Sequence, residues 1–252
     1  MAGTDNNLSA LVENVTPIII LVEPQLGENI GMVARAMLNC GVTELRLVRP
    51  RDGWPNEKAF SAASGANTVI EGAKIFSTLE DAIADLAYLY AATARERDMT
   101  KRVVTPHTCA SEIRAKGSLS CGILFGNEAK GLKNDDIALA DTILMVPLNP
   151  AFTSLNLSQA VLLAVYEWHK LGDETPADVL NMQSSRPANK KELNELFEHL
   201  ESALDDTGFF HVREKKPIMT RNIRNLLHRA APTEQEVRTL RGIIKSLFNY
   251  KQ

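Results

Sequence analysis

The chain has 252 residues, of which 44% are hydrophobic, and its formal net charge is −3. This length and composition allow a sizeable core, in one large domain or in one medium domain with an appendage. The longest apolar runs, such as 18–22, are much shorter than the roughly 20 residues that span a bilayer, and residues 1–14 lack the pattern of a signal peptide. We therefore expect a cytoplasmic protein that does not enter the membrane.

Short β-rich runs alternate with helical periodicity from residue 17 onward. The apolar continuity of these runs indicates buried, parallel strands, and the alternation with helices is typical of an α/β fold. Strands are predicted at 18–22, 44–48, 87–92, 121–125 and 142–146. Helices are predicted at 29–40, 79–85, 107–115, 134–138 and 155–171.

The alternation stops after residue 171, where two prolines, a serine pair and a lack of periodicity indicate a linker. Further helices are predicted beyond it at 191–204, 220–229 and 234–248. The predicted organisation is an α/β domain at 1–171, a linker at 172–190 and a small α-helical basic extension at 191–252.

The end of the chain is basic, because residues 211–252 hold ten Lys or Arg against three Glu, a charge of +7. A basic segment on an acidic body suits contact with nucleic-acid phosphates. A solvated helical face, or a helix pair that stabilises a dimer, explains the same pattern equally well.

Asn29 and Gly31 precede the part of a predicted helix that carries Arg35. A hydroxyl or oxyanion near that helix start would meet backbone amides and a guanidinium together. The structural alternative is a helix-capping Asn and a surface Arg.

A second polar turn follows the strand at 121–125, where Gly126 and Asn127 lead to the carboxylate of Glu128 and a closing glycine, Gly131. Loops after buried strands are the usual ligand sites of α/β proteins, although a plain turn would use the same residues. A third turn holds Ser154, Asn156 and Ser158 before an apolar helix. One of the three is expected to cap that helix, and capping does not explain all three.

Several other site types are excluded. The chain has neither G-x-G-x-x-G after its first strand nor a G-x-x-x-x-G-K-[ST] loop, so a dinucleotide-binding dehydrogenase and a P-loop enzyme are not expected. The five histidines are scattered without ligand spacing, and the three cysteines are widely separated. We therefore expect no metal centre, and we interpret the cysteines as reduced structural thiols.

Three segments in chain order, LVEPQLGENIGMVARAMLNCG, ILFGNEAKGL and MVPLNPAFTSLNLSQAVLLAVYE, resemble the signature motifs of the SpoU branch of the SPOUT methyltransferases. The similarity is closest to the TrmJ-like tRNA ribose methyltransferases. A fourth segment, AATARERD, adds to it, and the resemblance covers about residues 16–170. The basic tail also looks like the helical extension of TrmJ-like enzymes.

This resemblance implies a SPOUT-type parallel sheet whose C-terminal segment threads a loop to form a trefoil knot. It also implies the cofactor S-adenosylmethionine and a homodimer whose active site mixes residues of both subunits. The expected partner is tRNA, and the expected product is 2′-O-methylribose at position 32 of the anticodon loop. A related enzyme for rRNA or another tRNA position, and a non-catalytic RNA-binding module of the same fold, are the alternatives.

The resemblance also assigns residues. The catalytic set comprises Arg35, Ser154, Asn156, Glu128 and Asn29. The cofactor-binding set comprises Ala92, Thr93, Ala94, Gly126, Asn127, Val146, Pro147, Thr153, Ser154, Leu155 and Asn156. Because a guanidinium keeps its proton, Arg35 is expected to orient the hydroxyl and stabilise the developing alkoxide, with help from Ser154. Glu128 is expected to order its loop, and a role as base stays open.

Overall fold

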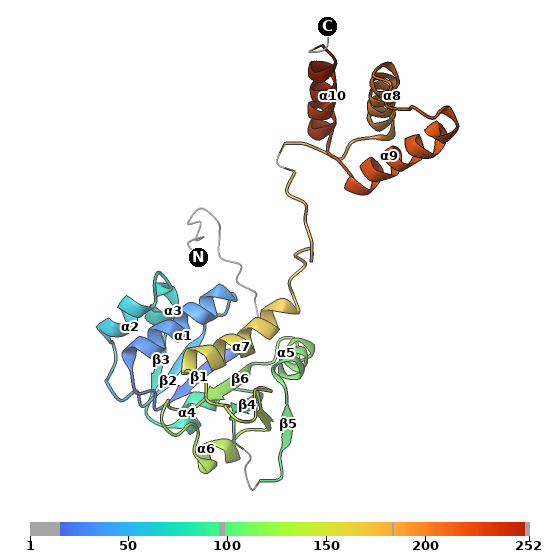
Figure 1. Cartoon of the computed structure of the whole chain (residues 1–252). Helices are drawn as coiled ribbons and strands as arrows, with labels where there is room; N and C mark the ends of the chain where they lie inside the picture. The colour runs from blue at the N-terminus through green and yellow to red at the C-terminus, as the bar shows by residue number, and fades with distance from the viewer. Residues whose placement is uncertain (1–15, 96–98, 183, 250–252) are drawn as a thin grey trace. The chain divides into compact units, whose positions relative to one another are not determined.

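The computed structural model describes residues 16–95, 99–182 and 184–249. The chain divides into two compact units between Glu174 and Thr175, inside the predicted linker. The first is an α/β unit and the second is α-helical (Figure 1). Within the described ranges, every helix is too short or too polar to cross a membrane. Residues 1–14, judged above for a signal peptide, lie outside these ranges.

A parallel sheet forms the centre of the first unit, with seven strands among the described residues in the order β3-β2-β1-β6-β4-β7-β5. The strands are β1 (Ile18–Val22), β2 (Leu45–Val48), β3 (Lys74–Phe76), β4 (Tyr88–Ala92), β5 (Arg102–Val104), β6 (Cys121–Phe125) and β7 (Thr142–Leu144). Every residue of β1, β2, β6 and β7 is buried, as expected for strands covered on both faces.

Two hydrophobic cores lie on opposite faces of this sheet. Because side chains alternate along a strand, Ile19 and Leu21 of β1 enter one core, and Ile18 and Ile20 enter the other. The first core is covered by α1 (Gly27–Asn39), α2 (Glu57–Ala62), α3 (Asn67–Glu71), α5 (Pro106–Ala115) and α7 (Leu157–Lys170). The second is covered by α4 (Leu79–Ile83) and α6 (Asn134–Ala138).

The predicted parallel α/β fold is confirmed, and the prediction of five strands was incomplete. The two strands it missed, β3 and β5, form the edges of the sheet, and each has only three residues, two of them exposed. Such strands lack the apolar continuity by which buried strands are recognised. The helix predicted at 155–171, α7, begins at Leu157 rather than Leu155, and the helix predicted at 29–40, α1, begins at Gly27 rather than Asn29.

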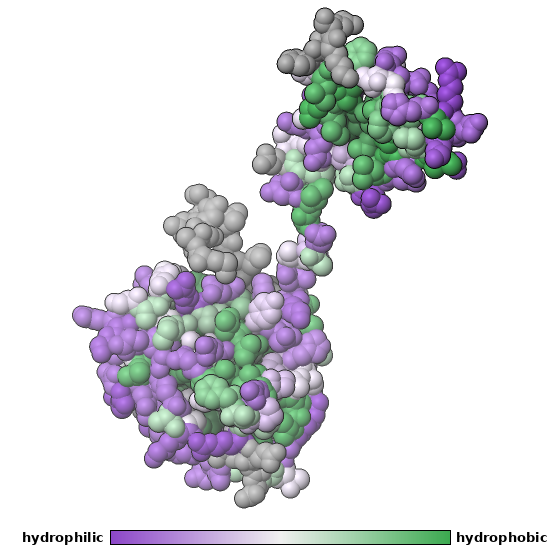
Figure 2. Space-filling model, viewed as in Figure 1, coloured by the Kyte–Doolittle hydropathy of each residue, from purple (hydrophilic) through white to green (hydrophobic). Residues whose placement is uncertain are grey.

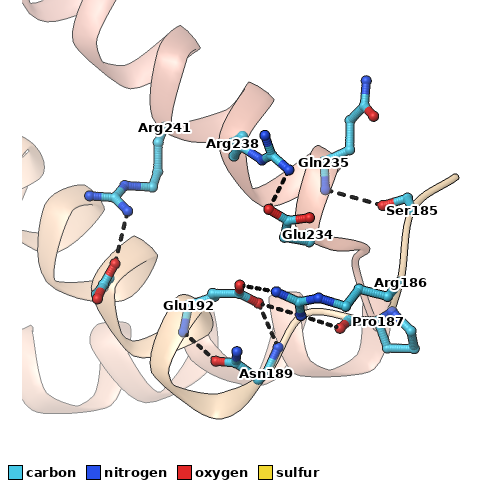
Figure 3. Close-up of polar contacts among 10 residues, drawn as sticks. Ser185, Arg186, Pro187, Asn189, Glu192, Glu234, Gln235, Arg238 and Arg241 are labelled. Carbon is cyan, nitrogen blue, oxygen red and sulfur yellow. Dashed lines mark hydrogen bonds and ion pairs between the residues drawn. The ribbon is translucent and has the colours of Figure 1, made fainter.

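The second unit has a small core of its own, formed by Leu193, Leu196, Phe197 and Val237. Its elements are α8 (Lys190–Asp206), the 3-10 helix η1 (Arg213–Lys215), α9 (Lys216–Ala230) and α10 (Glu234–Asn249). The segment before α8 contacts both α8 and α10 (Figure 3): Arg186 pairs with Glu192 of α8, and Ser185 accepts the Gln235 backbone N–H of α10.

The charge of this unit is much lower than the tail alone suggests. Residues 175–252 hold thirteen Lys or Arg against ten Asp or Glu, because α8 is acidic. Its carboxylates pair with the cations of the later helices: Glu201 with Arg224, Asp205 with Lys216 and Glu195 with Arg241. The basic tail is therefore partly neutralised within its own unit.

Candidate active site

Three polar segments meet where β1, β6 and β7 end, at the carboxyl edge of the sheet. β1 and β6 are hydrogen-bonded neighbours, so the segment 23–26 after β1 lies beside the loop 126–133 after β6. The third segment, 145–156, connects β7 to α7, which packs against α1. The carboxyl ends of parallel strands are where open α/β sheets bind ligands.

Glu128 joins the first two segments. Its Oε2 accepts the backbone N–H of Gln25 at 2.9 Å, and its Oε1 accepts Nδ2 of Asn29 at 2.7 Å and the Leu26 N–H at 3.3 Å. The carboxylate thus lies at the N-terminus of α1, where backbone N–H groups lack partners and the helix dipole favours a negative charge. Both oxygens hold α1 in place, which is the contact set that an ordering role requires.

Asn29 continues the chain of contacts to the third segment. Its Oδ1 accepts Nδ2 of Asn156 at 3.2 Å, and the residue is buried in the first turns of α1. The N-cap of α1 is Leu26, so the interpretation of Asn29 as a helix cap was wrong. Asn29 instead connects α1, which carries Arg35, to the N-cap of α7.

Asn156 is the N-cap of α7. Its Oδ1 accepts the backbone N–H of Ser158 at 2.9 Å and the Ser158 hydroxyl at 2.8 Å, and Gln159 completes a capping box. Capping therefore accounts for two of the three polar side chains of this turn. The remaining one, Ser154, is exposed and lines a cavity.

The cavity has a volume of about 310 Å³ and lies at the ends of β4, β6 and β7. Predicted cofactor residues that line it are Ala92, Thr93, Ala94, Gly126, Val146, Thr153, Ser154 and Leu155. Asn127, Pro147 and Asn156 do not: the Asn127 side chain accepts the Lys130 N–H at 2.8 Å within the loop, and Pro147 is exposed.

Lining residues that the prediction missed include Arg95, Ala129, Lys130, Leu132 and Leu148. Most belong to the quoted segments AATARERD and ILFGNEAKGL, so the full motifs would have indicated them. Residues 96–98 of the former lie outside the described ranges. Phe125, Leu132 and Leu144 form a buried apolar floor, and the cationic Arg95 and Lys130 are exposed. The cavity suits a ligand with one apolar and one polar part.

Gly126 has a structural reason to be glycine. A Cβ at this position would lie 2.0 Å from the carbonyl carbon of Gly131 and 2.1 Å from the nitrogen of Leu132. Any side chain would therefore push apart the loop that forms the cavity wall.

Arg35 lies apart from this cavity. It is on the exposed face of α1 and does not line the cavity, and among the described residues no hydrogen bond or ion pair engages its guanidinium. The same ranges hold no group of three or more His, Cys, Asp or Glu able to bind a metal ion.

The fold and site define an α/β protein with a small-molecule cavity at the carboxyl edge of its parallel sheet. The chain belongs to the SpoU rRNA Methylase family, which matches residues 16–166. Residues 191–252 match the C-terminal domain of the tRNA methyltransferase TrmJ. The resemblance found in the sequence motifs is thereby confirmed, while threading of the knot stays a prediction.

Named relatives cover most of the chain. The tRNA (cytidine/uridine-2′-O-)-methyltransferase TrmJ of Salmonella typhimurium is 34% identical over 91% of this chain and 95% of its own length. The protein of the same name from Photorhabdus laumondii is 34% identical over 94% of this chain and 98% of its own length.

Solved structures agree with this assignment. TrmJ from Z. mobilis ZM4 is 48% identical, with a TM-score of 0.82 over 93% of this chain and 100% of that chain. The SpoU methyltransferase AviRb from Streptomyces viridochromogenes, solved with the cofactor AdoMet, is 16% identical with a TM-score of 0.53, over 68% of this chain and 66% of that chain. The second likeness shows the fold alone.

Proposed function

We propose that the protein transfers a methyl group from S-adenosylmethionine to a ribose 2′-hydroxyl of tRNA, at position 32 of the anticodon loop. The observation that carries this proposal is the Glu128–Asn29–Asn156 network, which joins the cavity wall to α1 and α7. The family match and the names of the full-length relatives support the reaction. Position 32 follows from the motif resemblance.

S-adenosylmethionine, whose sulfonium supplies the methyl group, fits the residues of the cavity. The apolar floor of Phe125, Leu132 and Leu144 suits an adenine ring, and the strand-end loops offer backbone polar groups. The hydroxyls of Thr153 and Ser154 lie on the segment that connects β7 to α7 and suit the polar part of the cofactor. The close approach at Gly126 keeps the wall in one shape.

The roles of the side chains follow from their contacts. Glu128 orders its loop, because both of its oxygens already accept hydrogen bonds from the start of α1. Asn29 and Asn156 hold α1 and α7 at one distance. Arg35 orients the 2′-hydroxyl and stabilises the alkoxide as it forms, and Ser154 assists by hydrogen bonding.

The role proposed for Arg35 requires its side chain to reach a cofactor cavity, and a homodimer makes this possible. Arg35 shares the exposed face of α1 with Met32, next to α7. Figure 2 shows hydrophobic residues gathered over these two helices. The exposed large hydrophobic residues on α1, at its N-cap and on α7 are Leu26, Met32, Leu162, Leu163 and Tyr166. A contiguous apolar face marks an interface, and a second copy seated on it would bring Arg35 to the partner's cavity.

The test is a map of 2′-O-methyl groups in bulk tRNA and rRNA from cells with and without the protein. Loss at tRNA position 32 alone is expected. Purified protein and S-adenosylmethionine should then methylate a tRNA transcript, and the same transcript with 2′-deoxyribose at position 32 should stay unmethylated. Loss of 2′-O-methylation at another position would assign the enzyme a different target nucleotide. Unchanged methylation maps with retained tRNA binding would favour the non-catalytic RNA-binding module.

A further inference from the structure

Two residues at the carboxyl edge of the sheet have an uncommon backbone conformation. Glu23 has φ of 51° and Arg49 has φ of 48°, in the left-handed region that residues other than glycine rarely enter. Each is the first residue after its strand, and the two strands, β1 and β2, are paired at Val22 and Val48. Such conformations persist where the surrounding structure holds them, and they gather at functional sites.

Charged contacts hold these two residues. Glu23 Oε1 accepts Nζ of Lys133 at 2.9 Å and Nη2 of Arg49 at 3.2 Å, and Nη1 of Arg49 donates to the Ser77 carbonyl at 3.1 Å. Lys133, and after it Arg49, hold the pKa of Glu23 below its usual range, against the effect of burial. Glu23 follows β1, Arg49 follows β2 and Lys133 ends the loop after β6. Because these strands are adjacent in the sheet, the three residues link three neighbouring strand ends.

Lys133 ends the loop that forms the cavity wall, and this loop is a compact body. The Gly131 N–H donates to the Asn127 carbonyl at 2.9 Å, and Gly126 packs against Gly131 and Leu132. The loop 126–133 contacts the segment 23–29 at two points, through Glu128 in the middle of the loop and through Lys133 at its end.

We propose that Glu23 and Lys133 form a positioning tie that holds the cavity wall against the first turn of α1. Glu23 is thus a positioning residue that keeps the cavity and the ribose-facing helix in one relative geometry. The consequence for methyl transfer rests on the proposed function; the tie itself rests on the contacts. Lys133 is exposed and Glu23 is half-buried, and ion pairs that are open to solvent contribute little to folding, so the effect of this pair belongs to local geometry rather than to stability.

The chain supplies a matched control at the opposite edge of the sheet. Lys74 Nζ lies 2.9 Å from Glu44 Oε1, and the side chains are 57% and 32% exposed. The corresponding values for Lys133 and Glu23 are 2.9 Å, 59% and 30%. Each carboxylate also pairs with an arginine. The two pairs differ in place, because Glu44 precedes β2 and Lys74 begins β3, far along the strands from the cavity wall.

The experiment compares Lys133→Met with Lys74→Met by amide hydrogen exchange and by calorimetric titration with S-adenosylmethionine. Lys133→Met should speed exchange of the Gln25 and Leu26 amides, which donate to Glu128, and should weaken cofactor binding, each by about threefold to fivefold. Lys74→Met should leave both values unchanged. The two variants should lower the melting temperature by similar, small amounts. Lys133→Arg should restore most of both values.

Glu23→Gln tests the tie a second time, since it keeps the size of the side chain and removes the charge; it should reproduce Lys133→Met. Equal exchange in Lys133→Met and Lys74→Met would overturn the tie. If the unaltered protein fails to bind S-adenosylmethionine, the proposed function fails, while the exchange comparison still decides whether the tie exists.

Discussion

Single side chains at this site build the fold and the site at the same time. Asn156 caps α7 with its oxygen and reaches Asn29 with its nitrogen. Glu128 stabilises the start of α1 with the same oxygens that fix the cavity wall. At the scale of the residue, folding and assembly of the site are therefore one event, and substitutions have to be chosen to separate them.

Asn156→Asp separates the two roles of this residue. Aspartate caps helices as well as asparagine, so stability should stay within about 0.5 kcal/mol. The Nδ2 donor to Asn29 is lost, however, and Asn29 cannot turn its amide without pointing its oxygen at Glu128. Methylation should fall in the folded variant, and Asn156→Ala should lose about 1 kcal/mol of stability as well. Full activity of Asn156→Asp would contradict a positioning role for the bond.

Arg35→Ala should lower the turnover of methyl transfer by about 10²–10³-fold, because a group that stabilises developing charge is removed. Affinity for S-adenosylmethionine should stay within a few-fold, since Arg35 does not line the cavity of its own chain. Arg35→Lys keeps the charge but not the planar fork, and is expected to restore little. Loss of cofactor binding in a folded, dimeric Arg35→Ala protein, measured by calorimetry, would refute the assigned role.

Arg46 is a buried structural arginine that bonds the Ala82 carbonyl at 2.6 Å, Glu44 at 2.8 Å and Asp85 at 2.9 Å. Burial raises the pKa of Glu44, but hydrogen bonds from Lys74 and Arg46 outweigh burial, so this pKa lies below its usual value. Arg46 also lowers the pKa of Asp85. Their stabilising effect is thus fully present above the ordinary values of 4.5 and 3.8, and it is lost as the pH falls through the lowered values.

Arg46→Met should therefore destabilise the first unit by about 2 kcal/mol at neutral pH, and the difference from the unaltered protein should shrink near pH 3. Urea unfolding at both pH values measures this. A cost that stays constant with pH would show that the bond to the Ala82 carbonyl and packing, rather than the carboxylates, account for the role of Arg46.

At the scale of the element, close packing of α1 on α2 requires a glycine. A Cβ on Gly31 would lie 2.2 Å from the Ala59 carbonyl oxygen and 2.8 Å from the Ala62 Cβ. Gly31→Ala should therefore destabilise the first unit by about 1–3 kcal/mol, as overpacking does. A Cβ on Gly242 of α10 would meet no atom within 4 Å among the described residues outside its own helix backbone, and Gly242→Ala should stabilise its helix by about 0.5–1 kcal/mol. Calorimetric melting of both variants should show opposite shifts; shifts of the same sign would disprove the packing argument.

At the scale of the whole molecule, the second unit adds a basic surface. Among its described residues, only some Arg and Lys side chains are free of ion pairs within the unit and therefore available to contact RNA phosphates. Arg224 is held by both oxygens of Glu201 at 2.6 and 2.8 Å, whereas Arg221 and Arg229 on the same helix are exposed. If this helix meets tRNA phosphates, replacing Arg221 and Arg229 by Ala should lower the log–log salt slope of tRNA binding by roughly 0.7 to 0.9 per lost contact.

Arg224→Ala serves as the matched control and should leave the slope unchanged, because its guanidinium is already paired. Filter binding across a salt series measures both variants. An unchanged slope in the double variant would refute the phosphate contact. Dissociation of that variant to monomers would favour the alternative, in which the second unit stabilises a dimer.

Much of the fold could be predicted from local sequence patterns. Buried strands such as β1 and β6 are apolar along their whole length, and the turn at 154–158 carries its own capping signal. The motif residues lie in continuous segments, so eight of the predicted cofactor residues line the cavity. The strands and the capped turn depend on neighbours in the chain, and the amino-acid sequence by itself determined them, whereas the cofactor residues were assigned by the family resemblance.

Tertiary structure alone decided the features whose partners are distant in the chain. Glu128 bonds Asn29 across 99 residues, which no local pattern indicates. The edge strands β3 and β5 form because β2 and β7 offer hydrogen-bonding groups, and the +7 tail is partly neutralised because α8 packs its carboxylates against it. Gly31 and Gly126 are required by close approach of other backbone segments. In each case the deciding energy comes from a contact that exists only after the chain has folded.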